Sequence, residues 1–259
     1  MENLYNFSET EMLAFALVLF RILAFMVAMP VFGTQSVPVQ VKVLFSLTMA
    51  FILFPVIGYQ NLNVNLTEIG AAQLAIREIF LGLVFGYLVR IFFMSLSMAG
   101  QIISVSLGVA SAQLFNPAFG DSGSSFDQFF MILGTLFFLA INGHHLFIGG
   151  LIDTYRLIPL EAGTLNFESF AQVAAIVQEA TEVAIKFAAP VFVTILFTNA
   201  AMGLIGRTVP QINILITSLP VNTMVGLAVM FLSLPLMIWQ MEDLLQSTAE
   251  MVFSVMKEL

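Results

Sequence analysis

REIFLGLVFGYLVRIFFMSLSMAG, residues 77–100, is the stretch of this 259-residue chain that indicates most about its fold. Apolar residues fill it almost without interruption, and it exceeds the roughly 20 residues that a helix needs to cross a bilayer. At intervals of four, a slowly drifting row along one helix face takes in Glu78, Gly82, Gly86 and Arg90. The glycines form a G-x-x-x-G pattern that allows close helix approach, so we expect this row to hold helix contacts and ion pairs.

The composition of the whole chain is that of a membrane protein. Hydrophobic residues make up 59% of it and charged residues only 9%, whereas a soluble domain has about 25% charged residues. Cysteine is absent, which excludes disulfides and cysteine-ligated metals. The net charge of −8 comes without a basic patch to displace counterions from phosphates, so nucleic acid is not an expected partner.

About six apolar stretches reach or approach the length of a membrane span, and each is bounded by proline, glycine, asparagine or charge. They cover residues 12–32, 43–57, 71–97, 129–152, 183–205 and 212–239. Because they show no strict alternation of apolar and polar residues, they predict an all-α fold, a hydrophobic and membrane-associated set of bent helical hairpins. Near the chain start, Ser8 and Glu11 have capping-box spacing, which predicts that a helix begins there.

Ionisable residues interrupt most of these stretches. A charge at bilayer depth costs at least about 2.5 to 3.5 kcal/mol, so Arg21, Glu78 and Lys186 are expected to be paired, buried against protein or exposed to water. On a helix, Arg77 points about 100° away from Glu78, and we expect it to serve a different partner.

The last third of the chain predicts a helical hairpin with a sharp bend. GRTVPQINILITSLP, residues 206–220, turns the chain through Arg207 and Pro210. Pro190 and Pro235 lie inside apolar runs on either side of this bend. Each lacks a backbone N–H and clashes with the preceding turn, which predicts a kink.

The most polar interior segment is SAQLFNPAFGDSGSSFDQ, residues 111–128. Turn-forming residues are concentrated in it: Asn116, Pro117, Gly120, Asp121, Ser122 and Gly123. They predict a loop rather than a helix. A surface connection is the ordinary interpretation, and closure of a pore by a flexible loop between two buried helices is the functional one.

The chain has two histidines, His144 and His145, within AINGHHLFIGG, residues 140–150. A catalytic metal site normally has three protein ligands with helical spacings such as i, i+4, and Asp153 is the only carboxylate nearby. A proton relay is conceivable because histidine titrates near neutral pH. The pattern favours a structural histidine that donates a hydrogen bond to a backbone carbonyl and ends a turn.

Four segments between residues 21 and 227 carry a resemblance to a known family. They are RILAFMVAMPVFGTQSVPVQVKVLFSL, REIFLGLVFGYLVRIFFMSLSMAGQIISVSLG, NGHHLFIGGLIDTYRLIP and GRTVPQINILITSLPVNTMVGL. In order and spacing they resemble the FliR family, the R subunit of the flagellar type III export gate and a homologue of an inner-membrane subunit of virulence injectisomes. In this family the landmark at a helical bend corresponds to Asn142, Gly143, His144 and His145.

The resemblance also implies a division of the chain. FliR-like proteins resemble a P-type subunit fused to a Q-type subunit, which implies a P-like region at residues 1–165 and a Q-like hairpin region at residues 166–259. In the hairpin, Arg207, Pro210 and Gln211 would shape the bend. The polar loop would be a plug that closes the resting pore, with candidate residues Phe115, Asn116, Pro117, Gly120, Asp121, Ser122 and Gly123.

The implied function is that of a non-enzymatic channel subunit without cofactors. The chain would be a single copy in a hetero-oligomer with P-type and Q-type gate subunits, and would conduct unfolded flagellar proteins. Its location would be the bacterial inner membrane at the flagellar basal body. Two alternatives come from other classes: a secondary transporter that uses the mid-stretch charges as binding groups, and a membrane metalloenzyme centred on the histidines and Asp153.

Overall fold

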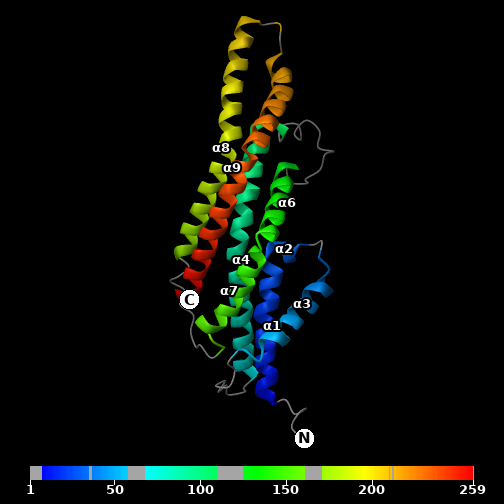
Figure 1. Cartoon of the computed structure of the whole chain (residues 1–259), viewed down its shortest axis with the longest axis vertical. Helices are drawn as coiled ribbons and strands as arrows, with labels where there is room; N and C mark the ends of the chain where they lie inside the picture. Colours follow the sequence, from blue (N-terminus) through cyan, green and yellow to red (C-terminus); the bar gives the residue numbers. More distant parts are fainter. Residues whose placement is uncertain are drawn as a thin grey trace. The chain divides into compact units, whose positions relative to one another are not determined.

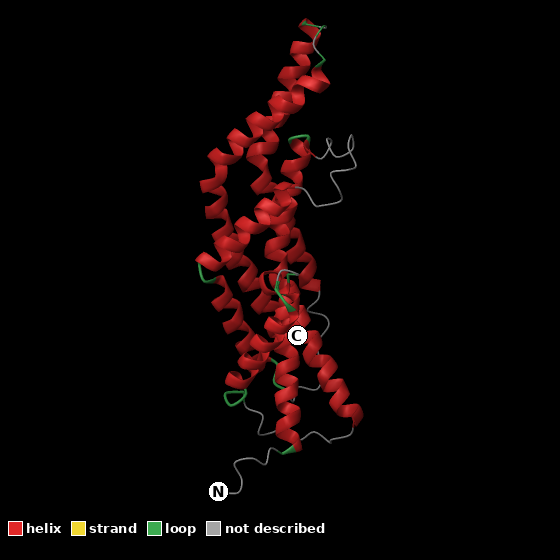
Figure 2. Cartoon of the chain, turned by 90° about the vertical axis from the view of Figure 1, so that its right-hand side faces the viewer, coloured by secondary structure: helices red, strands yellow, loops and turns green. Residues whose placement is uncertain are grey.

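The computed structural model describes residues 8–34, 37–57, 68–109, 125–160, 171–209, 211 and 213–258, and the regular secondary structure in these ranges is helical (Figures 1 and 2). The helices are α1 (Glu9–Ala28), α2 (Pro30–Gly33), α3 (Val39–Leu53), α4 (Glu68–Ser106), α6 (Ser125–Ala140), α7 (Gly143–Leu157), α8 (Ala171–Thr208) and α9 (Ile214–Glu258). The predicted all-α fold is therefore confirmed. Each predicted apolar stretch coincides with a helix or a pair of consecutive helices.

Four of the described helices are long and apolar enough to cross a membrane. These spans are Glu9–Ala28, Ile69–Ser106, Val173–Thr208 and Ile216–Glu258. Helices α6 and α7 together would make a fifth, broken span. At 15 residues, α3 is shorter than the roughly 20 residues needed to cross a bilayer.

Local sequence signals set the ends of α1. Ser8 Oγ accepts a hydrogen bond from Glu11 N at 3.2 Å and Glu11 Oε2 accepts one from Ser8 N at 2.9 Å, so the predicted capping box is confirmed. At the other end Met29 is extended (φ −70°, ψ 127°). The following Pro30 disfavours helical geometry in Met29 and then occupies the first position of α2, where its missing N–H costs nothing.

The prolines inside the last two helices do not end them. Helix α8 continues through Pro190, and α9 continues through Pro220 and Pro235. A hydroxyl group lies beside the first of these prolines, since Thr194 Oγ1 donates to Pro190 O at 2.7 Å. The kinks predicted at Pro190 and Pro235 stay predictions, because a helix that continues through a proline can still be bent there.

The described chain divides into two compact units that interleave along the sequence. The first contains residues 1–91, 142–175 and 248–259, and the second contains residues 92–141 and 176–247. Helices α4, α8 and α9 each contribute to both units. The P-like and Q-like division predicted at residue 165 concerns sequence relationship rather than compactness, and it stays a prediction.

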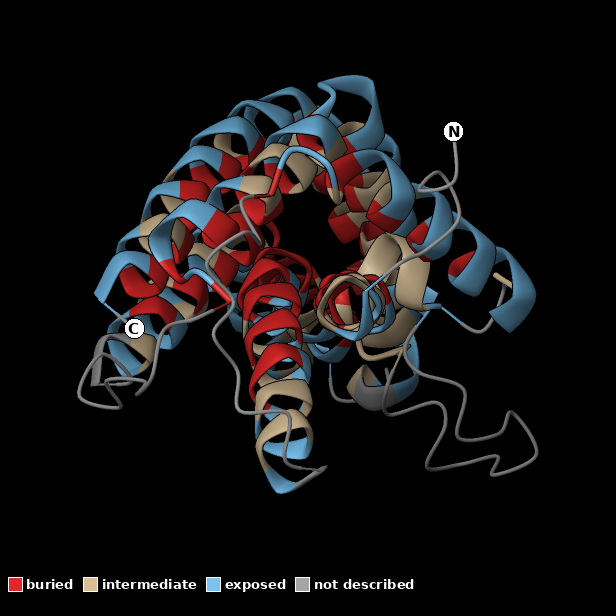
Figure 3. Ribbon diagram, turned by 90° about the horizontal axis from the view of Figure 1, so that it is seen from below, coloured by how far each residue is buried: buried red, intermediate tan, exposed pale blue. Residues whose placement is uncertain are grey.

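Aromatic side chains fill the core of the first unit. Phe85 of α4 lies 5.3 Å from Phe25 of α1 and 6.4 Å from Phe253 of α9, measured between ring centres. Gly150 of α7 makes room for both of the rings from α4 and α9, because a Cβ atom there would lie 3.1 Å from Phe85 Cζ and 2.6 Å from Phe253 Cζ. Figure 3 shows buried and exposed stretches following one another along the same helices.

The core of the second unit also contains packed aromatic rings and a glycine at a close contact. Phe138 of α6 lies 6.3 Å from Phe92 and 5.5 Å from Phe93, both on α4. Gly134, one turn before Phe138, lies against the side chain of Leu96. Helices α4 and α6 therefore pack closely in this unit.

Candidate functional site

A buried ion-pair cluster joins α1, α4 and the end of α7 in the first unit. Arg21 Nε donates to Glu78 Oε2 at 2.5 Å, and Arg77 Nη2 donates to Glu78 Oε1 at 2.8 Å. Arg21 and Glu78 are fully buried, and Arg77 is 9% exposed. One carboxylate thus binds two guanidinium groups in a low-dielectric interior. Removal of one partner there leaves an uncompensated buried charge, which strongly lowers the stability of the fold. We call these residues the Arg21–Glu78–Arg77 cluster.

The last turn of α7 and the residue that follows it surround the guanidinium group of Arg21. Its Nη1 donates to Thr154 Oγ1 at 3.2 Å and its Nη2 donates to Ile158 O at 3.1 Å. The ring of Tyr155 lies over the guanidinium group, with 4.2 Å between the ring centre and Cζ. Because the Tyr155 hydroxyl donates to Val18 O at 3.1 Å, the tyrosine also ties α7 to the backbone of α1.

Arg77 extends from α4 to the segment that follows α7. Its Nη2 donates to Pro159 O at 3.0 Å and to Leu160 O at 2.8 Å, as well as to Glu78. The prediction that Arg77 serves a different partner is therefore only half right: its long side chain also reaches back to the neighbouring carboxylate. Its Nε and Nη1 atoms are buried without a hydrogen-bond partner in the described part of the chain. Carbonyl oxygens near a helix C-terminus carry partial negative charge, which compensates part of the positive charge of Arg77.

The predicted glycine row lies against α1 one and two turns beyond Glu78. A Cβ atom on Gly82 would overlap Arg21 O, and one on Gly86 would lie 2.6 Å from Ala28 Cβ and 2.9 Å from Phe25 O. Backbone-to-backbone approach at this distance is possible only with glycine. The fourth member of the row, Arg90, is exposed instead.

The bend between α8 and α9 lies in the second unit. Arg207, in the last turn of α8, and Gln211, in the turn that follows, are both exposed, and Pro210 lies outside the described residues. Below the bend, Asn222 Nδ2 of α9 donates to Asn199 Oδ1 of α8 at 2.8 Å. Sequence reasoning missed this pair, because two asparagines 23 positions apart show no pattern until the hairpin is formed.

The histidine landmark marks a break between two helices. Asn142 has left-handed backbone angles (φ 58°, ψ 28°) and precedes Gly143, the first residue of α7. The His144 and His145 rings lie 4.1 Å apart. His144 Nδ1 is buried and has no hydrogen-bond partner in the described ranges, so the predicted bond to a backbone carbonyl is not observed at this atom, and the histidines begin a helix rather than end a turn.

The remaining charged candidates do not form one site with the histidines. Among the described residues, no group of three or more histidine and carboxylate side chains lies close enough to hold a metal ion. Asp153 pairs with Arg156 at 3.3 Å, and both side chains are more than half exposed. Lys186 pairs with Glu182 at 2.8 Å, one helical turn away on the exposed surface of α8.

The candidate plug lies outside the described residues. This applies to all of its members: Phe115, Asn116, Pro117, Gly120, Asp121, Ser122 and Gly123. The description stops at residue 109, shortly after α4, and resumes at Ser125 with α6. Residues 125–128, which the sequence predicted to be part of the loop, are therefore helical, and that end of the prediction is wrong. The plug assignment stays a prediction.

Comparison with known proteins gives one consistent family. A sequence model described as bacterial export proteins, family 1, matches residues 12–248. The flagellar biosynthetic protein FliR of Caulobacter vibrioides is 32% identical over 226 residues, which cover 86% of this chain and 90% of the relative. FliR proteins of Bacillus subtilis and Escherichia coli K12 are 30% and 27% identical, over 82% and 93% of this chain and 83% and 92% of their own lengths.

Glu78→Gln is expected to destabilise the protein by about 3–5 kcal/mol, because it leaves two buried guanidinium groups without their counter-charge. The melting temperature of the purified chain in mild detergent measures the loss. Asp153→Asn is the matched control: it breaks an exposed ion pair, which is worth about 1 kcal/mol or less. Equal shifts in the two variants would contradict the role assigned to the cluster.

Gly82→Ala and Gly149→Ala are expected to change stability in opposite directions. The new methyl group at position 82 would overlap the backbone of α1 at Arg21 O, which predicts a loss of about 1–3 kcal/mol. A Cβ atom on Gly149 would meet no described atom within 4 Å, so there alanine gains up to about 1 kcal/mol of helix propensity. Thermal unfolding of both variants in the same detergent tests this, and a neutral Gly82→Ala would show that α1 and α4 are not in close contact.

Proposed function

Because the chain belongs to the FliR family of bacterial export proteins, we propose that it is a membrane subunit of a flagellar type III protein export apparatus. The observation that carries the proposal is the family match, which extends over residues 12–248 and so takes in nearly all of the described helices. The relatives are named for flagellar biosynthesis. Several helices long and apolar enough to cross a membrane agree with a membrane subunit.

The exposed apolar surface of the two hairpin helices, α8 and α9, supports an assembled rather than a solitary protein. In the most apolar window of Val173–Thr208 only 17% of residues are buried, and in that of Ile216–Glu258 only 28%. Large side chains such as Phe197 (67% exposed) and Leu232 (82% exposed) therefore need lipid or other subunits to cover them. Export gate subunits of P type and Q type are the partners we propose, with this chain present as one copy.

We propose separate roles for the P-like and Q-like regions of the sequence. The P-like region, residues 1–165, contains the Arg21–Glu78–Arg77 cluster and, before α6, the candidate plug residues 115–123, which we assign as the plug of the conduit for unfolded flagellar substrates. The Q-like region, residues 166–259, forms the hairpin of α8 and α9. The proposed location is the inner membrane at the flagellar basal body.

The two alternative functions have less support. A transporter would need Arg21, Glu78 and Lys186 to be available to a ligand, but the first two bind each other in the interior and Lys186 binds Glu182 on the surface. A metalloenzyme would need a third ligand beside the histidines, and the described residues provide no such group.

Co-expression with the neighbouring genes tests the assembly. The native mass in mild detergent is expected to correspond to one copy of this chain in a larger complex with two other small hydrophobic proteins. The exposed apolar surfaces of α8 and α9 are the physical reason, since they are stable only when covered. A monomer or a homo-oligomer that is indifferent to the neighbouring proteins would overturn the proposal.

Deletion of residues 120–125 tests the plug separately. The variant complex is expected to assemble and to leak ions across the membrane above the level of the unaltered complex, because the closing loop is shortened. Reconstituted vesicles with a fluorescent ion indicator provide the measurement. Deletion of residues 60–65, which also lie between two helices, is the control, and unchanged leakage in the 120–125 deletion would remove the plug assignment.

A further inference from the structure

Helix α3 buries two polar side chains while most of its large apolar side chains are exposed. Lys42 and Ser46 are buried, whereas Leu44 (62% exposed), Phe51 (76%) and Ile52 (58%) face away from the protein. The ammonium group of Lys42 is held inside by Gly33 O at 3.0 Å and Thr34 O at 2.9 Å. A surface of this kind is stable next to hydrocarbon, which is as apolar as the leucine and phenylalanine side chains.

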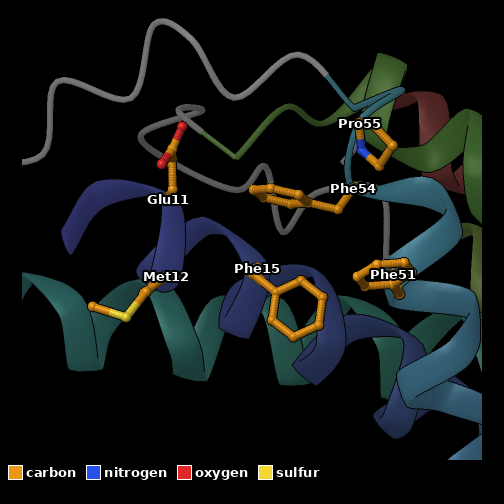
Figure 4. A pocket seen from close by; sticks show the side chains of 6 residues that line it. All are labelled: Glu11, Met12, Phe15, Phe51, Phe54 and Pro55. Carbon is orange, nitrogen blue, oxygen red and sulfur yellow. The ribbon is translucent and has the colours of Figure 1, made fainter. Parts of the chain in front are cut away.

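A pocket of about 580 Å³ opens on this surface between α1 and α3, within the first unit. Its volume lies in the roughly 300–1,000 Å³ range of small-ligand pockets. The lining residues are Glu11, Met12, Phe15, Phe51, Phe54 and Pro55. Phe15 and Phe54 meet edge to face with 5.6 Å between ring centres, which joins the two helices at the pocket (Figure 4).

The described lining of the pocket is apolar except at one place. Among the described residues that line it, Glu11 is the one that is charged, and Figure 4 shows Glu11 and Met12 on one side of Phe15, with Phe51 and Pro55 on the other. Glu11 also belongs to the first turn of α1, so the carboxylate lies where an apolar helix begins. The described lining therefore combines an apolar body with the negative charge of Glu11 at the end of a candidate membrane span.

We propose that this pocket binds one acyl chain of an aminophospholipid, with the lipid amine beside Glu11. The carboxylate is complementary to a primary ammonium group, and it disfavours a lipid whose headgroup carries only negative charge. One turn of helix, with a diameter of 10–12 Å and a pitch of 5.4 Å, occupies roughly 500 Å³, so the pocket of about 580 Å³ has room for no more than about one turn of a partner helix. An unbranched acyl chain enters it lengthwise. The proposal does not depend on the export function.

The headgroup preference is tested in nanodiscs made of equal parts phosphatidylethanolamine and phosphatidylglycerol. Native mass spectrometry of the full-length chain, released from the discs, is expected to show phosphatidylethanolamine as the retained lipid. Glu11→Gln removes the charge but preserves the capping box, in which glutamine serves as well as glutamate. It is expected to lower the preference for the amine about two- to five-fold, the range for an exposed ion pair. Glu9→Gln, in the same helical turn but outside the pocket, is the control and is expected to change nothing.

The pocket itself is tested by filling it. Met12→Trp is expected to abolish retention of the bound lipid, whereas Ile69→Trp, at an exposed apolar residue that does not line the pocket, is expected to leave retention unchanged. Equal retention in the two variants, or equal loss, would overturn the proposal. So would retention without any headgroup preference in the unaltered chain.

Replacement of Phe51 by the photoreactive residue p-benzoyl-phenylalanine distinguishes lipid from protein as the occupant. Phe51 is largely exposed, so the larger ring fits without disturbing the fold. Illumination of the membrane-embedded protein, expressed together with its neighbouring genes, is expected to add the mass of a phospholipid. A crosslink to another polypeptide would assign the pocket to a subunit contact and overturn the lipid proposal.

Discussion

The buried carboxylate of Glu78 is the constraint on which the first unit depends. It binds the guanidinium groups of Arg21 and Arg77, and these in turn bind oxygen atoms at the end of α7. The glycines one and two turns further along α4 set how closely α1 lies, and the ion pair sets where along α4 it lies. Distance and register are thus fixed by different residues on one helix face, and neither can change without breaking a buried contact.

The sequence predicted much of this arrangement and could not have predicted the rest. The free-energy cost of an unpaired charge in hydrocarbon was enough to predict that Arg21 and Glu78 have partners, but it did not identify those partners. Arg90 does not lie on the same helix face as Glu78. Each step of four residues turns the helix by about 40° beyond a full circle, so the three steps from Glu78 to Arg90 add up to about 120°. The oxygens of Ile158, Pro159 and Leu160 belong to the backbone, which has no residue-type signature.

The two units differ in where their polar and apolar side chains lie. In the first unit a charged cluster and the buried Lys42 and Ser46 of α3 place polar groups inside, whereas large apolar side chains of α3 are exposed. In the second unit, the rings of Phe92, Phe93 and Phe138 pack together and Gly134 lies against Leu96. A hydrogen bond between asparagines joins α8 and α9, whose apolar surfaces are mostly exposed. Side-chain composition alone does not separate the two, since both are rich in phenylalanine. The difference lies in which surfaces are left for other molecules to cover.

The order of the cluster along the chain has a consequence for biosynthesis. Arg21 is made 57 residues before Glu78 and 133 residues before Thr154. At roughly 5–20 residues per second, the first of these delays is about 3–11 s. During that interval a helix that is to be inserted into the membrane carries an arginine without its counter-ion. Entry of α1 therefore becomes more favourable once α4 emerges, because Glu78 then supplies the counter-charge of Arg21.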